Sequence, residues 1–424
     1  MAGLPDRRTV WYWCLYDWAN SAFATVMLTA VLPTYFLHVA PERVRALGLE
    51  WPAESLWAYT VGASAGIMAL LMPVLGAIAD QVGRRFAYLV AFAAVGVLAT
   101  AATGAVPPTV WWGLLGAFIV GNVGFEGSLV FYNALLPHVV GPKDYDRVSS
   151  WGFAAGYVGG GLALAGVLAW LWVAPTRWDI PAVQAVRHGL VATGFWWGLF
   201  GAVACWGLRH VEPRAPRPSS WGEAFRQGWT RLRQTFRALR PYRSAFRFLV
   251  AYWIYNDAVE TTIALAAVFG QKALDIPQTR LILIVLIVQF LAFPGALFWG
   301  WVTRRVATFH VLEVLLALWA GFTASAFFIR TEAAFWGLAV GIAWVLGGIQ
   351  ALSRSYYARL FPSESSGEFF GFYAVTSKFA AILGPILVGA ATQVFGHIRY
   401  GVPGLVLFYI VGWFLLRTIP PEDR

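Results

Sequence analysis

Apolar runs of similar length recur along the whole chain, separated by polar connections that are mostly short. Each run is close to the ~20 residues that an α-helix needs to cross the hydrocarbon core of a bilayer. The runs do not alternate between apolar and polar positions, as the strands of a membrane barrel do. We therefore predict an all-α integral membrane protein with twelve transmembrane helices, at residues 10–38, 55–79, 86–106, 110–136, 149–173, 189–208, 247–270, 279–302, 308–329, 333–357, 368–394 and 398–417.

One long connection divides these spans into two sets of six. We expect an N-terminal six-helix bundle at 1–208, a cytoplasmic linker at 209–246 and a C-terminal six-helix bundle at 247–424. Apolar residues in the linker recur every three or four positions with arginines between them, which predicts an amphipathic helix on the lipid surface. The alternative is an ordinary linker helix packed against the ends of the spans. The apolar positions are Trp221, Phe225, Trp229, Leu232, Phe236 and Leu239.

Composition and charge support a membrane location. The 424 residues are 59% hydrophobic and only 12% charged, whereas about a quarter of a soluble domain is charged. Most of the 31 lysines and arginines fall in alternate connections, and by the positive-inside rule that side is cytoplasmic. We expect a multi-pass protein of the cell membrane with both termini in the cytoplasm. Because topology accounts for the net charge of +10, no nucleic-acid partner is expected.

The first span carries polar residues deep inside its apolar run. Asp17, Asn20 and Ser21 are spaced i, i+3 and i+4, so they share one helical face. A carboxylate at the centre of a membrane helix costs roughly 2.5–3.5 kcal/mol for insertion, so it is expected to face protein or water. This span is therefore predicted to form one wall of an internal polar path.

Four further spans carry polar residues that agree with such a path. Spans 4, 7, 10 and 11 contribute Asn122, Glu126, Asn133, Asn256, Asp257, Glu260, Gln350, Arg354 and Lys378. Carboxylates such as Asp17, Glu126, Asp257 and Glu260 are candidates to bind protons, because loss of water favours their neutral form. Lys378 and Arg354 are candidates to hold an anionic group. The competing interpretation is that these charges form structural salt bridges between the bundles, with Arg354 as a gate at the cytoplasmic helix end.

The connection between spans 2 and 3 reads Gly76-Ala-Ile-Ala-Asp80-Gln-Val-Gly83-Arg84-Arg85. Gly76 lets a neighbouring helix approach closely, Gly83 permits a tight turn, and Asp80 can cap the N-terminus of an adjacent helix. We expect the two arginines to pair with Asp144 and Asp146 in the next cytoplasmic connection. The segment resembles the signature loop of the major facilitator superfamily, where it acts as a conformational latch.

Several other segments resemble one branch of that superfamily, the vacuolar amino-acid effluxer family linked to autophagy. They are Tyr16-Asp17-Trp18-Ala19-Asn20-Ser21-Ala22, Tyr132-Asn133-Ala134-Leu135-Leu136-Pro137, residues 148–160, Gln350-Ala351-Leu352-Ser353-Arg354-Ser355 and Glu368-Phe369-Phe370-Gly371-Phe372-Tyr373. The chain is similar to the compact bacterial members, which lack large lumenal insertions. The resemblance implies two six-helix bundles with spans 1, 4, 7 and 10 lining a central cavity.

We therefore predict a secondary active transporter that works by alternating access and is coupled to protons through its buried carboxylates. The favoured substrate is a small polar solute, an amino acid or a short peptide. Two alternatives stay open: a multidrug or lipid exporter of the same fold, and a non-transporting receptor or scaffold. No metal-ligand spacing or nucleophile motif indicates an enzyme, and no cofactor is expected. The expected partners of the monomer are the solute, protons and membrane lipids.

Overall fold

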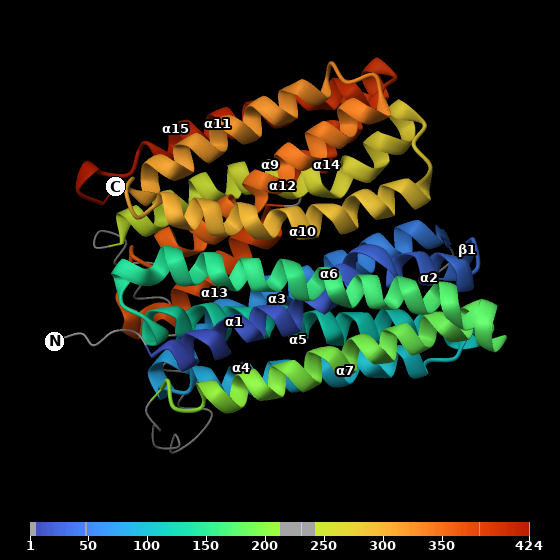
Figure 1. The fold of residues 1–424 in the computed structure, drawn as a ribbon, viewed down its shortest axis with the longest axis horizontal. Coiled ribbons are helices and arrows are strands. Elements are labelled where there is room, and N and C mark those ends of the chain that lie inside the picture. The colour runs from blue at the N-terminus through green and yellow to red at the C-terminus, as the bar shows by residue number, and fades with distance from the viewer. Residues whose placement is uncertain (1–5, 47–48, 213–229, 231–241, 381, 424) are drawn as a thin grey trace.

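The computed structural model describes residues 6–46, 49–212, 230, 242–380 and 382–423, which are almost entirely helical (Figure 1). The first half contains α1 (Arg7–Ala22), the π-helix η1 (Phe23–Ala30), α2 (Leu32–Val39), α3 (Ala53–Val82), α4 (Arg85–Ala105), α5 (Trp111–Val139), α6 (Tyr145–Trp178) and α7 (Ala182–Leu208). The second half contains α9 (Arg243–Leu274), α10 (Gln278–Val302), α11 (Thr308–Ala326), α12 (Glu332–Tyr357), α13 (Ser366–Phe379), α14 (Leu383–Phe395) and α15 (Val402–Leu416). Almost all of the linker segment predicted to form a surface helix lies outside the described residues.

Eleven helical segments of the described chain are long and apolar enough to cross a membrane. One of them runs through α1, η1 and α2, and another runs through α13 and α14. α9 is not among the eleven, although its 32 residues are long enough. Asn256, Asp257 and Glu260 at its centre make it less apolar than its neighbours. Together with α9, the described helices make the twelve predicted passes of an all-α membrane protein.

The helices gather into two groups, and α1 begins at the same end of the molecule at which α15 ends (Figure 1). We call this end the terminal side. In the first group, α4 packs against α5 and α7, and α1 packs against α6 and α7. In the second group, α10 packs against α12, and α15 packs against α9 and α11. The groups meet where α3 contacts α13 and where α6 contacts α10 and α12.

Glycines permit the closest helix crossings. A Cβ on Gly124 of α5 would lie 2.4 Å from the backbone nitrogen of Gly96 on α4, and a Cβ on Gly76 of α3 would lie 2.2 Å from the carbonyl oxygen of Gly367 on α13. Membrane helices gain little from the hydrophobic effect when they associate, so close backbone packing between small residues holds them together. Gly76 therefore has the role that its sequence context predicts.

Local irregularities occur at several places. Gly83 adopts φ +62° at the end of α3, which confirms the predicted tight turn before α4. Two features were not predicted. The first span contains η1, an eight-residue π-helix. An antiparallel hairpin, β1 (Arg43–Ala46) and β2 (Leu49–Pro52), follows α2. The eleventh span is broken between α13 and α14, next to Gly384-Pro385, a pair that can kink a helix.

The α4–α5 crossing generates a stability prediction with a matched control on the same helix. Gly124→Ala should destabilise the protein by about 1–3 kcal/mol, because the new methyl group overlaps the α4 backbone. Gly116→Ala should be neutral or slightly stabilising, because no atom lies within 4 Å of its Cβ position. Thermal unfolding of the purified variants measures both effects. Equal stability of the two variants would contradict this packing.

Candidate functional site

A polar cavity of about 400 Å³ lies between the two groups of helices. Its walls come from α1, η1, α5, α6, α9, α10, α12 and α13. The sequence-predicted cavity candidates that line it are Asp17, Asn20, Glu126, Asn256, Glu260, Gln350 and Lys378. Arg354, Asn133 and Ser21 also line it, whereas Asp257 does not.

Arg354 on α12 closes the cavity toward the terminal side. Its guanidinium donates to Asp17 Oδ2 at 3.3 Å and to Asn133 Oδ1 at 3.2 Å, so it binds α1 and α5 of the opposite group. It also donates to Ser149 on α6, to Oγ at 2.8 Å and to the carbonyl oxygen at 2.9 Å. Three helices of the first group therefore bind a single side chain of the second group.

The surroundings of Arg354 are aromatic and dry. Its guanidinium carbon lies 4.2 Å from the ring centre of Phe153 and 4.7 Å from that of Trp13. Cation–π attraction of this kind strengthens when the cation is desolvated. Only 2% of Arg354 and 6% of Asp17 is exposed. Tyr132 donates its hydroxyl to Asp17 Oδ2 at 2.7 Å, so the carboxylate has a second fixed partner.

A second ion pair joins the two groups at the cavity wall. Lys378 on α13 binds the carboxylate of Glu126 on α5. Glu260 on α9 lines the same cavity and is close enough to both to interact electrostatically. Nearby, Tyr157 on α6 donates its hydroxyl to Gln350 Oε1 at 2.5 Å. The cavity charges are therefore held mainly by contacts between the groups.

Two buried amides provide uncommitted donors. Asn20 is 2% exposed and Asn256 is 4% exposed, and both line the cavity. Within the part of the chain that the structure describes, their Nδ2 atoms have no hydrogen-bond partner. Buried polar atoms are almost always paired in native proteins. These two donors are therefore suited to a polar group that enters the cavity.

Asp257 has a different position from the other predicted carboxylates. Its side chain accepts hydrogen bonds from the backbone nitrogens of Leu383 (3.0 Å) and Gly384 (2.7 Å). Thr261 donates to the same carboxylate at 3.2 Å. These nitrogens begin α14, where a helix has unsatisfied N–H groups and favours a negative charge. Asp257 therefore caps the second half of the broken eleventh span.

Asp80 does the same for the first half of that span. Its oxygens accept from the backbone nitrogens of Gly367 (2.9 Å) and Glu368 (2.8 Å), at the start of α13. The predicted capping role of Asp80 is confirmed, and the capped helix belongs to the other group. Arg85 donates to Asp80 at 2.6 Å and to Glu212 at 2.8 Å. It also reaches the carbonyl oxygen of Glu364 at 2.6 Å, which adds another contact across the groups.

The predicted pairing of Arg84 and Arg85 with Asp144 and Asp146 is wrong. Asp144 pairs with Arg147 at 2.8 Å, within its own turn of chain. Asp146 instead faces the second group. It accepts from Thr308 (2.6 Å), Ser355 (2.5 Å) and Arg359 (2.8 Å).

Sequence reasoning missed Arg359 as the partner of Asp146. It also missed Ser149 and Glu212, because neither stands out from its local sequence. A signal for Arg359 existed in the sequence, because it lies in a segment at the end of span 10 that resembles the end of span 4. The two segments are Tyr356-Tyr357-Ala358-Arg359-Leu360-Phe361-Pro362 and Phe131-Tyr132-Asn133-Ala134-Leu135-Leu136-Pro137. A prediction that Asp146 contacts the end of span 10 would have suggested the ion pair between Asp146 and Arg359.

A family model described as "Vacuole effluxer Atg22 like" matches residues 5–423. Among curated relatives, the chain is 34% identical over 415 residues to the uncharacterized MFS-type transporter YxiO of Bacillus subtilis, covering 97% of this chain and 94% of that protein. It is 26% identical over 381 residues to autophagy-related protein 22 of Saccharomyces cerevisiae, covering 78% and 70%.

Among solved structures, the fold is similar to that of the fucose:proton symporter FucP of E. coli. The TM-score is 0.69 at 13% sequence identity, with 97% of this chain and 98% of that chain covered. At this identity the likeness concerns the fold.

The position of Arg354 generates a prediction about closure of the terminal side. Arg354→Gln leaves Asp17 without its cation, and breaking a buried ion pair costs about 3–5 kcal/mol. The closed arrangement should therefore loosen. An impermeant maleimide applied from the terminal side should label Ser21→Cys faster in this variant, in a background where Cys14 and Cys205 are serine.

Arg280→Gln provides the control, because Arg280 is a surface arginine whose partner, Glu332, is also partly exposed. Its labelling rate should match that of the parent. An unchanged rate in Arg354→Gln would mean that this ion pair does not hold the terminal side closed.

Proposed function

Because this chain belongs to the Atg22-like vacuole effluxer family of the major facilitator superfamily, we propose that it moves a small solute across the membrane by alternating access. The family consists of transporters, so the chain is a membrane transporter and not an enzyme. In the proposal, residues 1–208 and 247–424 are the two bundles that rock around the polar cavity. Residues 209–246 link them.

One observation supports this proposal most directly: Arg354 and its partners seal one end of a charged cavity. The latch residues Gly76, Asp80, Gly83, Arg84 and Arg85 lie at the end of α3, in the turn and at the start of α4, beside this sealed end. Asp80 binds the start of α13, and Arg85 binds Glu364 in the turn before α13. In an alternating-access cycle these contacts break when the other end closes. Because these contacts are numerous and buried, the other state needs new contacts that contribute a comparable free energy.

The topology follows from the arginine distribution. We propose that the terminal side faces the cytoplasm and that the protein lies in the plasma membrane. The structure then represents a conformation closed toward the cytoplasm.

The substrate we favour is a small polar or zwitterionic solute, with amino acids or short peptides first. The name of the matching family and the free donors of Asn20 and Asn256 support this choice. Proton coupling is part of the proposal, because Asp17 and Glu126 are buried carboxylates that line the cavity, and burial favours the neutral form of a carboxyl group. An exporter of apolar or drug-like solutes is the second candidate, favoured by an apolar cavity that adjoins the polar one.

Transport by proteoliposomes tests both parts of the proposal. With a mixture of radiolabelled amino acids as the probe, an imposed pH gradient should change the uptake rate severalfold. Asp17→Asn and Glu126→Gln should each lower uptake by about tenfold or more, because each leaves a buried cation unpaired.

Glu332→Gln is the matched control, since Glu332 pairs at the surface with Arg280 and lines neither cavity. It should retain the uptake rate of the parent. Proton coupling is excluded if the uptake rate does not change with the pH gradient and both cavity variants stay fully active.

A further inference from the structure

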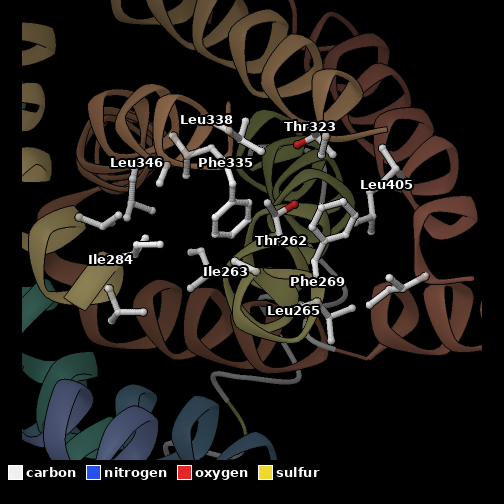
Figure 2. A pocket seen from close by; sticks show the side chains of 18 of the residues that line it. Thr262, Ile263, Leu265, Phe269, Ile284, Thr323, Phe335, Leu338, Leu346 and Leu405 are labelled. Carbon is white, nitrogen blue, oxygen red and sulfur yellow. The ribbon is translucent and has the colours of Figure 1, made fainter. Parts of the chain in front are cut away.

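A second cavity lies inside the second group of helices and is almost entirely apolar. Its volume is about 220 Å³. Figure 2 shows Phe269 and Phe335 next to each other among the side chains that line it, with Ile284, Leu338 and Leu405 around them. For comparison, an engineered apolar cavity of about 150 Å³ stays dry and binds benzene. A space of this size and polarity is suited to a hydrocarbon group.

This apolar cavity adjoins the polar one. Thr29, Ile263, Gln289 and Leu346 line both cavities. If these four side chains move aside, a molecule in the polar cavity can extend an apolar part into the apolar one. The two cavities together form one site with a charged compartment and an apolar compartment.

The charged compartment has one carboxylate more than its cations neutralise. Asp17 pairs with Arg354, and Glu126 pairs with Lys378. Glu260 remains, and among the described residues it makes no hydrogen bond or ion pair of its own. Lys378 is close enough to attract it, but the ammonium is already bound to Glu126.

The two cations are not equally available to a ligand. Arg354 donates four hydrogen bonds to protein oxygens, and Lys378 is shared between carboxylates. Protein carboxylates already balance both positive charges, so neither cation favours an anionic ligand. A positively charged group beside Glu260 would instead balance the compartment.

Glu260 stands at the entrance to the apolar compartment. Ile263 is three residues further along α9, on the same face of the helix, and lines both cavities. Ala266 and Phe269 continue at the same interval and line the apolar cavity. From Glu260 to Ala266 the helix rises about 9 Å. Each step of three residues turns about 60° around the helix, so this row of residues winds along α9 from a free negative charge into the hydrocarbon pocket.

We propose that the site binds amphiphilic amines, with the ammonium group beside Glu260 and the apolar group in the cavity that Phe269 and Phe335 line. The proposal rests on the transport function proposed above and specifies its substrate class. In this proposal the ligand needs no carboxylate, so an amine without a carboxylate should bind.

Binding of n-alkylamines to the full chain in lipid nanodiscs tests this directly. Propylamine, butylamine, hexylamine and octylamine are titrated by calorimetry, and empty nanodiscs provide the correction for partitioning into lipid. Affinity should rise about fourfold for each added methylene, until the chain fills the apolar compartment. Alcohols and carboxylates of the same lengths should bind at least tenfold more weakly.

Two variants with matched controls test the charged compartment and the apolar compartment separately. Glu260→Gln should weaken every amine by about tenfold or more while alcohols are unaffected. Glu332→Gln, a carboxylate outside both cavities, should change nothing. Ala266→Phe should remove the gain from the longer chains and leave propylamine unchanged. Val268→Phe adds a ring on the same helix at an exposed position that lines neither cavity, and should retain the gain.

The thermal unfolding of each ligand-free variant establishes that it is folded, and Ala339→Phe, also in the apolar cavity, replaces Ala266→Phe if that variant unfolds. Amine affinity that Glu260→Gln leaves unchanged would overturn the proposal and indicate that a proton neutralises Glu260. Stronger binding of carboxylates than of amines would also overturn it. Either result leaves transport itself intact, because the proteoliposome assay measures uptake independently.

Discussion

The buried ion pair between Asp17 and Arg354 is the interaction on which the closed end of this protein depends. Neither charge can remain in such a dry environment alone, so each requires the other. The pair joins the first helix of one group to α12 of the other. Aromatic rings and the Tyr132 hydroxyl then fix its geometry. Separation of the groups must hydrate both charges together, which makes closure cooperative rather than gradual.

Buried carboxylates also hold the two halves of the broken eleventh span. Asp80 from α3 binds the start of α13, and Asp257 from α9 binds the start of α14. One cap comes from the opposite group and the other from the same group. Relative movement of the groups therefore strains the first cap and spares the second. Lys378, between the two caps, changes its surroundings when the half-helices move relative to each other.

The sequence predicted the fold well because hydrophobic length and charge distribution are properties of single segments. It also predicted the capping role of Asp80, which depends on a local pattern. It assigned Asp257 to the cavity because adjacent residues on a helix differ by about 100° in direction, and spacing alone left its face undetermined. The partners of Asp146 were missed because they lie over 160 residues away. The π-helix has no residue pattern that predicts it. The break in the eleventh span does have a local signal, because it lies next to Gly384-Pro385, and proline is a common cause of helix kinks.

Many contacts between the two helix groups use main-chain atoms on one side. Asp80 binds backbone nitrogens, Arg85 binds the carbonyl oxygen of Glu364, and Ser149 donates to that of Ala351. The main-chain partner offers the same atom whatever its side chain. Substitutions at those positions therefore need no matching change across the interface. Paired variation among relatives should report contacts within each group more strongly than contacts between the groups, so methods that infer proximity from coevolution will underestimate how tightly this end is closed.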